Sequence, residues 1–334
     1  MVRTHSESGF SLVELLVATG LLLVVSSIVT GALMQMTQSQ TTIWNRTEMH
    51  SGIRGATELL QQEVGQAGRI NLPGTITLAG AVTAGEVFPT CDPGNPTTGA
   101  VTKTLATTST TEAATSGIFA DSTAPAYMLM TTMDGDSQET IKVAQVLSGT
   151  TISACFGKEH AAGAVLRPLG SFATGIIPNS GILNGSSATV LKMYGDINGD
   201  GNMVYVEYTC DTATRNLYRK VVELDGVKTA LTDSDILLSN VVANPGGTDC
   251  FTYQPVTMTV QGTPFTFILD VAITLTVETE QIDPITMQKQ TETKALLNVS
   301  PRNVFNAWML AGMGYTDRIQ STPATVTALL PPVS

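Results

Sequence analysis

The first strong pattern in the chain is an apolar run near its N-terminus. Residues 10–34 contain one charged residue, Glu14, and no Lys or Arg occurs between Arg3 and Arg46. About 20 residues of α-helix cross the hydrocarbon core of a bilayer, because each residue advances the helix by about 1.5 Å. The run is longer than the apolar core of secretory signal peptides, which spans roughly 7–15 residues. It therefore predicts a transmembrane helix over residues 10–34.

The helical pattern continues beyond this run without a proline until Pro73. Apolar residues recur there at three- and four-residue spacing, which produces one apolar stripe on a helix; they are Ile53, Ala56, Leu60, Val64 and Ala67. Gly68 predicts the C-terminal end of the helix. We therefore expect one helix over residues 10–68, about 87 Å long at about 1.5 Å per residue.

After residue 68 the pattern changes to short apolar runs separated by Gly, Pro, Asn and Asp, which is typical of strands and turns. The predicted strands are 127–133, 140–147, 151–156, 188–194, 204–210, 216–223, 265–279 and 291–299. The sequence thus predicts an α+β protein in which a long N-terminal helix packs on an antiparallel β-rich domain, residues 69–320.

Two segments of the chain have compositions that differ from the rest. Residues 94–117 are low in complexity and rich in Thr, which favours a mobile surface loop. Residues 321–334 carry three prolines and end the sequence, so we expect a flexible tail.

Composition and charge narrow the class of protein. Hydrophobic residues make up 43% of the chain, aromatic residues 5% and charged residues 13%, which is typical of a β-rich exported protein. A net charge of −11 with 17 Lys and Arg disfavours nucleic-acid binding, which depends on clustered cations. The densest basic group is interrupted by Glu223 and Asp225, which indicates a solvated strand surface; its members are Arg215, Arg219, Lys220 and Lys228.

The four cysteines lie far apart and lack the spacing of a zinc site. An even number in a chain that enters a membrane predicts two disulfides in an oxidising compartment. Four cysteines allow three pairings, of which we favour Cys91 with Cys155 and Cys210 with Cys250. Buried free thiols are the alternative.

The string Gly9-Phe10-Ser11-Leu12-Val13-Glu14-Leu15 resembles the processing site of type IV prepilins and type II secretion pseudopilins. The resemblance implies that residues 1–9 are a leader, that a prepilin peptidase cleaves between Gly9 and Phe10, and that the new amine of Phe10 is methylated. It also implies that Glu14 pairs with the N-terminal amine of a neighbouring subunit. The physical argument agrees, because an ionisable group inside a membrane segment is normally paired or functional. A single-pass anchor with a chance glutamate is the alternative.

Later segments resemble PilW-type minor pilins, namely YGDINGDG, VYVEYTC, NLYRKV, ILDVAITLTVETE and ALLNVSPRN. The resemblance implies a subunit of a type IV pilus, in its priming or tip complex. The implied partners are major and minor pilins, the prepilin peptidase, the inner-membrane assembly platform and, before assembly, membrane lipid.

The implied location is the inner membrane with a periplasmic domain, followed by the extracellular pilus. Arg3 supports this orientation, because positively charged flanks stay in the cytoplasm. Two rival interpretations remain: a minor pseudopilin of a type II secretion system, and an adhesive or DNA-binding module displayed at a tip.

Residues 196–202 carry acidic or amide oxygens at alternate positions and a glycine at the sixth, as calcium loops do. The expected calcium ligands are Asp196, Asn198, Asp200, the carbonyl of Asn202 and Glu207 at the twelfth position. The flanking segments alternate like strands rather than helices. A polar hairpin turn without calcium therefore fits the same residues.

Catalytic patterns are weak throughout the sequence. The three histidines, His5, His50 and His160, fall in the leader, in the long helix and in a loop. No nucleophile, base or phosphate-binding motif has the required spacing. The sequence favours a structural protein over an enzyme.

Overall fold

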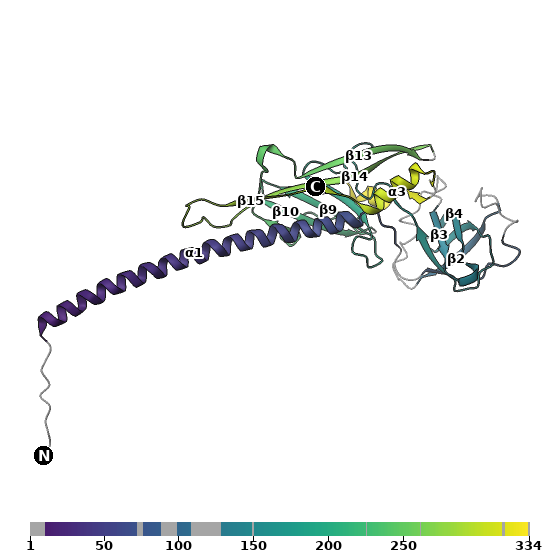
Figure 1. Cartoon of the computed structure of the whole chain (residues 1–334). Helices are drawn as coiled ribbons and strands as arrows, with labels where there is room; N and C mark the ends of the chain where they lie inside the picture. Colours follow the sequence, from purple (N-terminus) through teal and green to yellow (C-terminus); the bar gives the residue numbers. More distant parts are fainter. Residues whose placement is uncertain are drawn as a thin grey trace, which may run out of the picture. The chain divides into compact units, whose positions relative to one another are not determined.

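The structure is a computed structural model that describes residues 11–71, 76–87, 99–107, 128–148, 150–224, 226–260, 262–315 and 318–332. A long helix is followed by antiparallel β-structure, which confirms the predicted α+β class (Figure 1). The chain divides into two compact units. One is Met1–Ser51 with Glu278–Glu292, and the other is Gly52–Val277 with Thr293–Ser334.

Helix α1 spans Leu12–Gln66, close to the predicted bounds. It contains no proline, and several Thr hydroxyls along it donate to the carbonyl four residues earlier, as Thr37 does to Leu33 at 2.9 Å. The predicted stripe from Ile53 to Ala67 is buried. The chain leaves the helix at Gly68, whose φ of +80° is readily adopted by glycine and places its N–H 2.9 Å from the carbonyl of Tyr194.

Residues 76–169 contain a closed antiparallel barrel in the order β1-β2-β5-β4-β3-β6. Its strands are β1 (Ile76–Leu78), β2 (Val101–Thr107), β3 (Met128–Thr132), β4 (Thr140–Ser148), β5 (Thr151–Cys155) and β6 (Val165–Leu169). A 3₁₀ turn, η1, spans Gly135–Ser137. The interior is filled by aliphatic side chains such as Leu78, Val143 and Ile152. Strands β3, β4 and β5 were predicted, and β1, β2 and β6 were not.

Strand β2 corrects the prediction of a Thr-rich loop over residues 94–117 in its middle part. Lys103 and Leu105 are buried and alternate with the exposed Thr102 and Thr104, so this stretch has the two-residue period of a strand. The threonines concealed the period because they occupy its outward positions. Residues 94–98 and 108–117 of the predicted loop lie outside the described residues.

Two further sheets follow the barrel along the chain. The first has the order β11-β10-β9-β8, made of β8 (Val190–Gly195), β9 (Val204–Asp211), β10 (Asn216–Glu223) and β11 (Ile236–Ser239). In the second, β14 (Thr263–Glu278) pairs with β12 (Val241–Val242), β13 (Phe251–Val260) and β15 (Thr291–Val299). Short 3₁₀ turns, η2 (Asp233–Asp235) and η3 (Pro245–Gly247), lie between these strands.

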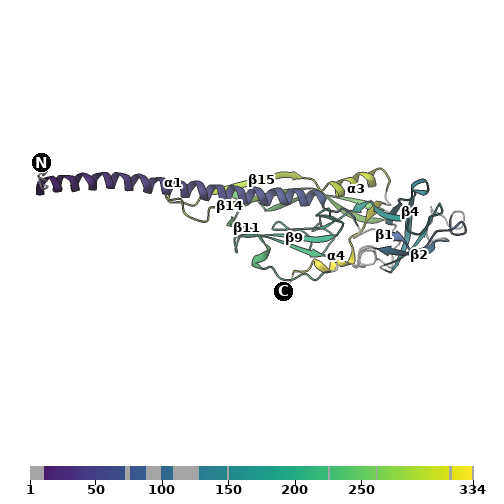
Figure 2. The ribbon, with the colours of Figure 1, turned by 90° about the horizontal axis from the view of Figure 1, so that it is seen from below.

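The C-terminal part contains two helices, α3 (Arg302–Gly312) and α4 (Ala324–Leu329) (Figure 2). Between them, β16 (Ile319–Gln320) pairs in parallel with β7 (Ser171–Phe172). Helix α4 corrects the prediction of a flexible tail over residues 321–334. Val326, Leu329 and Leu330 are buried in the same core cluster as the barrel interior. Apolar burial therefore fixes a segment whose prolines had suggested disorder.

Candidate functional site

Of the residues that the sequence singled out for assembly, the structure describes Glu14, at the N-terminal end of α1. Gly9 and Phe10 lie outside the described residues. Glu14 occupies the first turn of α1 and is exposed. Ser11 begins the helix, since its hydroxyl accepts from the N–H of Val13 at 3.3 Å. An acidic side chain in the first turn also interacts favourably with the helix dipole. Within the part of the chain that the structure describes, Glu14 has no ion-pair partner.

The first half of α1 exposes apolar side chains on all its faces. The helix is long and apolar enough to cross a membrane, with a mean hydropathy of 2.4 in its most apolar window. Burying one Leu, Ile or Val side chain stabilises by about 1.5–3 kcal/mol, so leaving this surface in water would cost tens of kcal/mol. The exposed apolar residues are Leu12, Val13, Leu15, Leu16, Val17, Leu21, Leu22, Leu23, Val24, Val25, Ile28, Val29, Leu33, Met34 and Met36. This part of the chain requires a lipid environment or other apolar helices around it.

A buried carboxylate near the end of α1, that of Glu63, attaches the helix to strands β9 and β10. Glu63 accepts a hydrogen bond from the Tyr208 hydroxyl at 2.5 Å and from Nε of Arg219 at 3.1 Å. Burial raises the pKa of Tyr208 above its usual value, and the neighbouring Glu63 raises it further. The Tyr208 hydroxyl therefore stays protonated and donates to Glu63.

Sequence reasoning missed Glu63, although a signal existed. It falls three residues after Leu60 and four before Ala67, on the side of the helix that the apolar stripe occupies. A carboxylate at such a position requires a partner inside the protein.

The prediction that the basic group containing Arg219 is a solvated surface is corrected by the structure. Its members form ion pairs: Arg219 with Glu63, Lys220 with Asp235, and Lys228 with Glu207.

The predicted calcium residues 196–202 form the turn between β8 and β9. Asp196 is buried. Its Oδ1 accepts from the N–H of Gly201 at 3.3 Å, and its Oδ2 accepts from Nδ2 of Asn71 at 3.0 Å and lies 3.5 Å from Nε of Arg69. Asp200 Oδ1 accepts from the N–H of Asn202 at 2.8 Å. These contacts are those of a polar turn whose side chains bond to its own backbone.

Glu207, the expected twelfth-position ligand, lies within β9 and is bound elsewhere. Its carboxylate accepts from Nζ of Lys228 at 2.8 Å, lies 3.7 Å from Nζ of Lys192, and accepts from the Tyr205 hydroxyl. The two lysines also donate to the carbonyls of Leu329 and Leu330 at 3.1 and 2.8 Å. Glu207 therefore belongs to the group that holds the end of α4, and the structure does not bring it to the turn.

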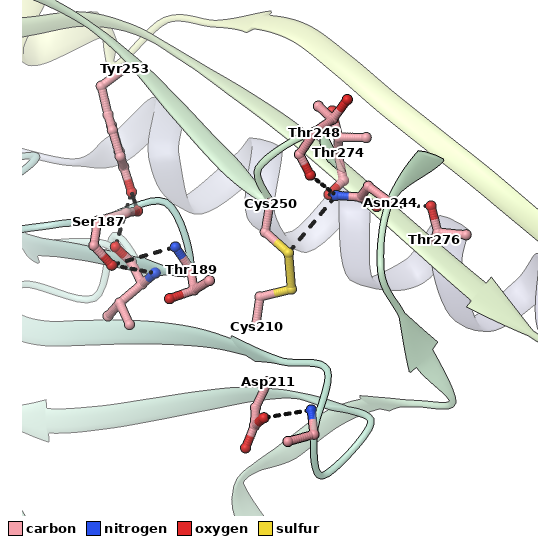
Figure 3. The surroundings of a disulfide bond; sticks show 12 residues. Ser187, Thr189, Cys210, Asp211, Asn244, Thr248, Cys250, Tyr253, Thr274 and Thr276 are labelled. Atoms are coloured by element: carbon pink, nitrogen blue, oxygen red, sulfur yellow. Dashed lines mark hydrogen bonds between the residues drawn. A yellow bond between two sulfur atoms is a disulfide. The ribbon is translucent and has the colours of Figure 1, made fainter. Parts of the chain in front are cut away.

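The described cysteines are all disulfide-bonded. Cys210, in β9, is joined to Cys250, which directly precedes β13 (Figure 3), and this is the pairing favoured from the sequence. Asn244 supports the bridge: its Nδ2 donates to the Thr274 carbonyl at 2.8 Å, and its Oδ1 accepts from the Thr276 hydroxyl at 2.8 Å. Cys155 is also disulfide-bonded, and its predicted partner Cys91 lies outside the described residues.

The remaining candidates for metal binding are His, Cys, Asp and Glu side chains elsewhere in the chain. Over the described ranges, no three His, Cys, Asp or Glu side chains are arranged to hold a metal ion. His160 is buried between two carboxylates, Asp134 at 2.6 Å and Glu139 at 2.7 Å, which makes it part of a buried polar network next to the barrel.

The similarity to known proteins that was found lies in the N-terminal segment. Residues 4–30 match the model of the prokaryotic N-terminal methylation motif. No curated protein and no solved structure matches the chain. The matched residues include Gly9, Phe10 and Glu14 and extend through most of the apolar run, so the chain begins with a prepilin-type segment.

Proposed function

We propose that the protein is a minor pilin of the PilW type, a structural subunit of a type IV pilus in its priming or tip complex, rather than an enzyme. The observation that carries the proposal is the methylation motif at residues 4–30, which leads directly into a helix with uncovered apolar faces. A segment of this kind is suited first to a membrane and then to a bundle of similar helices. The large β-rich domain suits a rare subunit better than a densely repeated one.

The proposed assembly step depends on the chemistry of the Gly9–Phe10 junction. A prepilin peptidase cleaves this bond and methylates the new amine, which carries a positive charge. An unpaired carboxylate costs about 2.5–3.5 kcal/mol at the centre of a membrane helix and less nearer its end. Pairing of Glu14 with the ammonium of a neighbouring pilin removes that cost, so the pair favours helix bundling in correct register.

The proposed partners are other major and minor pilins, the prepilin peptidase, the inner-membrane assembly platform and, before assembly, lipid. The chain would cross the inner membrane once with its β-rich domain in the periplasm and move to the extracellular pilus on assembly. The Cys210–Cys250 disulfide supports an oxidising compartment for that domain.

Substitution of Glu14 tests the proposal. We expect Glu14→Ala to be cleaved normally but to enter filaments several-fold less efficiently than the wild type, as measured by immunoblotting of sheared pili. Glu48→Ala is the matched control, because Glu48 is an exposed carboxylate on the same helix beyond the apolar run. Normal incorporation of Glu14→Ala would refute the role given to Glu14.

A minor pseudopilin of a type II secretion system is the nearest alternative, since the methylation motif is shared with that class. Deletion of the gene separates the two. Loss of pili and of twitching motility with normal secretion is expected for the proposed function. Loss of secretion with intact pili would replace it with the pseudopilin role.

A further inference from the structure

The segment that connects β14 to β15, with the start of β15, lies along α1 over slightly more than two helical turns (Figure 1). The hydroxyl of Thr42 donates to Oδ1 of Asp283 at 3.2 Å. One turn later Arg46 donates to Gln290, and a further turn later His50 contacts Glu292. These residues belong to one compact unit. The tip of the connection therefore lies beside Thr42, the contact nearest to the apolar run of α1.

The tip of this connection, residues 281–288, exposes apolar side chains to solvent. Ile282, Ile285 and Met287 are 57%, 62% and 74% exposed. Between residues 281 and 288 the single charged side chain is Asp283. It is buried and accepts from the N–H groups of Ile285 and Thr286 at 2.7 and 3.2 Å. The surface of the tip thus combines apolar and uncharged polar groups.

Helix α1 also exposes apolar side chains next to Thr42, which contacts the tip of the connection. Ile43 and Trp44, directly after Thr42, are 64% and 73% exposed. No charged residue occurs on α1 between Leu15 and Asn45, a length of about 46 Å at about 1.5 Å per residue. The apolar run itself ends at Met34, and residues 35–45 continue the helix without a charge for about 16 Å beyond it. The uncharged part of the helix therefore extends past the hydrocarbon core.

Both segments change from uncharged to charged residues at a matching position, just past the contact between Thr42 and Asp283. On α1 they start at Arg46, and on the connection they lie at its base, at Glu278, Glu280 and Lys289. Gln290, beside Lys289, contacts Arg46. Helix and connection thus share one boundary between an uncharged zone and a charged zone, as expected where a membrane protein leaves the headgroup layer.

We propose that Ile43, Trp44, Ile282, Ile285 and Met287 form a collar that rests in the headgroup layer of the bilayer where α1 leaves the membrane. The inference rests on the proposed transmembrane span and adds a second membrane contact, made by a segment about 240 residues later in the sequence. Tryptophan is favoured at this depth because its ring is apolar and its N–H is polar. The nearby charges are mostly acidic, so the collar suits zwitterionic lipids and does not rely on anionic ones.

Depth-dependent quenching with the full-length protein in phosphatidylcholine vesicles tests the collar. Ile285→Cys, Leu23→Cys and Leu183→Cys are each labelled with the fluorophore NBD; all three side chains are exposed, and Leu183 lies on neither α1 nor the connection. We expect headgroup spin labels to quench Ile285→Cys at least twofold more than Leu183→Cys. Deep acyl-chain labels should quench Leu23→Cys most strongly. Circular dichroism verifies that each labelled variant is folded.

The outcomes separate the collar from the span. Quenching of Leu23→Cys without quenching of Ile285→Cys would overturn the collar and leave the span intact. Absence of quenching at both positions would overturn the span as well. Burial of Ile285→Cys that occurs in assembled filaments but not in vesicles would assign the surface to a neighbouring subunit and also overturn the collar.

Trp44 gives an independent reading. The chain has two tryptophans, so Trp308→Phe leaves Trp44 as the single indole fluorophore. We expect lipids brominated near the headgroup to quench this variant more than lipids brominated near the chain end. Equal, negligible quenching by both would contradict the collar.

Discussion

The carboxylate of Glu63 on α1 and the guanidinium of Arg219 on β10 form an ion pair, with Nε of Arg219 3.1 Å from Oε1 of Glu63. Glu63 is almost fully buried, and Tyr208 donates a second hydrogen bond to it. The pair joins the last turns of α1 to the sheet that contains β9 and β10, and Figure 1 shows these strands next to this part of the helix.

Removal of Arg219 should destabilise that attachment. Breaking a fully buried ion pair costs about 3–5 kcal/mol, and the partial exposure of Arg219 reduces the expected cost of Arg219→Ala to about 2–4 kcal/mol. Urea unfolding of the full chain in detergent measures it, followed by the fluorescence of Trp308 in a Trp44→Phe background. Arg54→Ala is the control, because Arg54 pairs with Glu58 on the exposed face of α1 and should change stability little. Equal effects of the two substitutions would contradict the anchoring role.

Gly68 should tolerate no side chain. It adopts φ +80°, and a Cβ there would lie 2.9 Å from Cγ2 of Val304 and 3.1 Å from the carbonyl oxygen of Phe172. Strain and crowding together predict a loss of about 2 kcal/mol or more for Gly68→Ala. Gly65→Ala is the matched control: it lies within the helix with no atom near its Cβ position, and should stabilise by up to about 1 kcal/mol. Thermal unfolding of the two variants should shift in opposite directions.

The barrel should lose stability in acid through Glu86. Hydrogen bonds from Lys103 and from Thr83 lower the pKa of Glu86 to about 2 from its ordinary value near 4.5. Because the folded-state pKa is the lower one, the contribution is complete above about pH 4.5 and is lost as the pH falls towards 2. Glu86→Gln should flatten the pH dependence of stability in this window, whereas Glu159→Gln, at an exposed position beside the barrel, should not. An unchanged pH profile in Glu86→Gln would refute the assignment.

Calcium binding is proposed for the 196–202 turn without Glu207. The proposed ligands are then Asp196, Asn198, Asp200 and the carbonyl of Asn202, and a site with two carboxylates would bind calcium weakly, with a Kd of about 10⁻⁴–10⁻³ M. Calorimetric titration of the full chain with calcium should give heat that Asp200→Ala abolishes and Glu207→Gln preserves. No heat from the wild type at millimolar calcium would end the proposal.

Local periodicity accounts for the parts of the fold that the sequence predicted. Ile53 to Ala67 follow the period of a helix. Strands such as β9 and β10 are short runs of strand-forming residues bounded by turn residues. Each pattern can therefore be recognised within a few neighbouring positions. Helix α3 was missed although Val304, Ala307 and Ala311 have helical spacing, because the segment directly follows a predicted strand.

The unpredicted features depend on contacts between distant residues. Ile76 pairs with Thr107 on one side and Leu166 on the other, and this closure of the barrel has no local signature. Glu207 matched a calcium ligand by spacing, but Lys228 contacts it through the fold. The N-terminal methylation motif at residues 4–30 could be recognised from the sequence because its spacing is local.

The N-terminal sequence and intact mass of the mature protein, isolated from cells that express the prepilin peptidase, test the central claim most directly. We expect a mature chain that begins at Phe10 with a methylated amine and lacks residues 1–9. A mature protein that retains Met1 through Gly9 would contradict it.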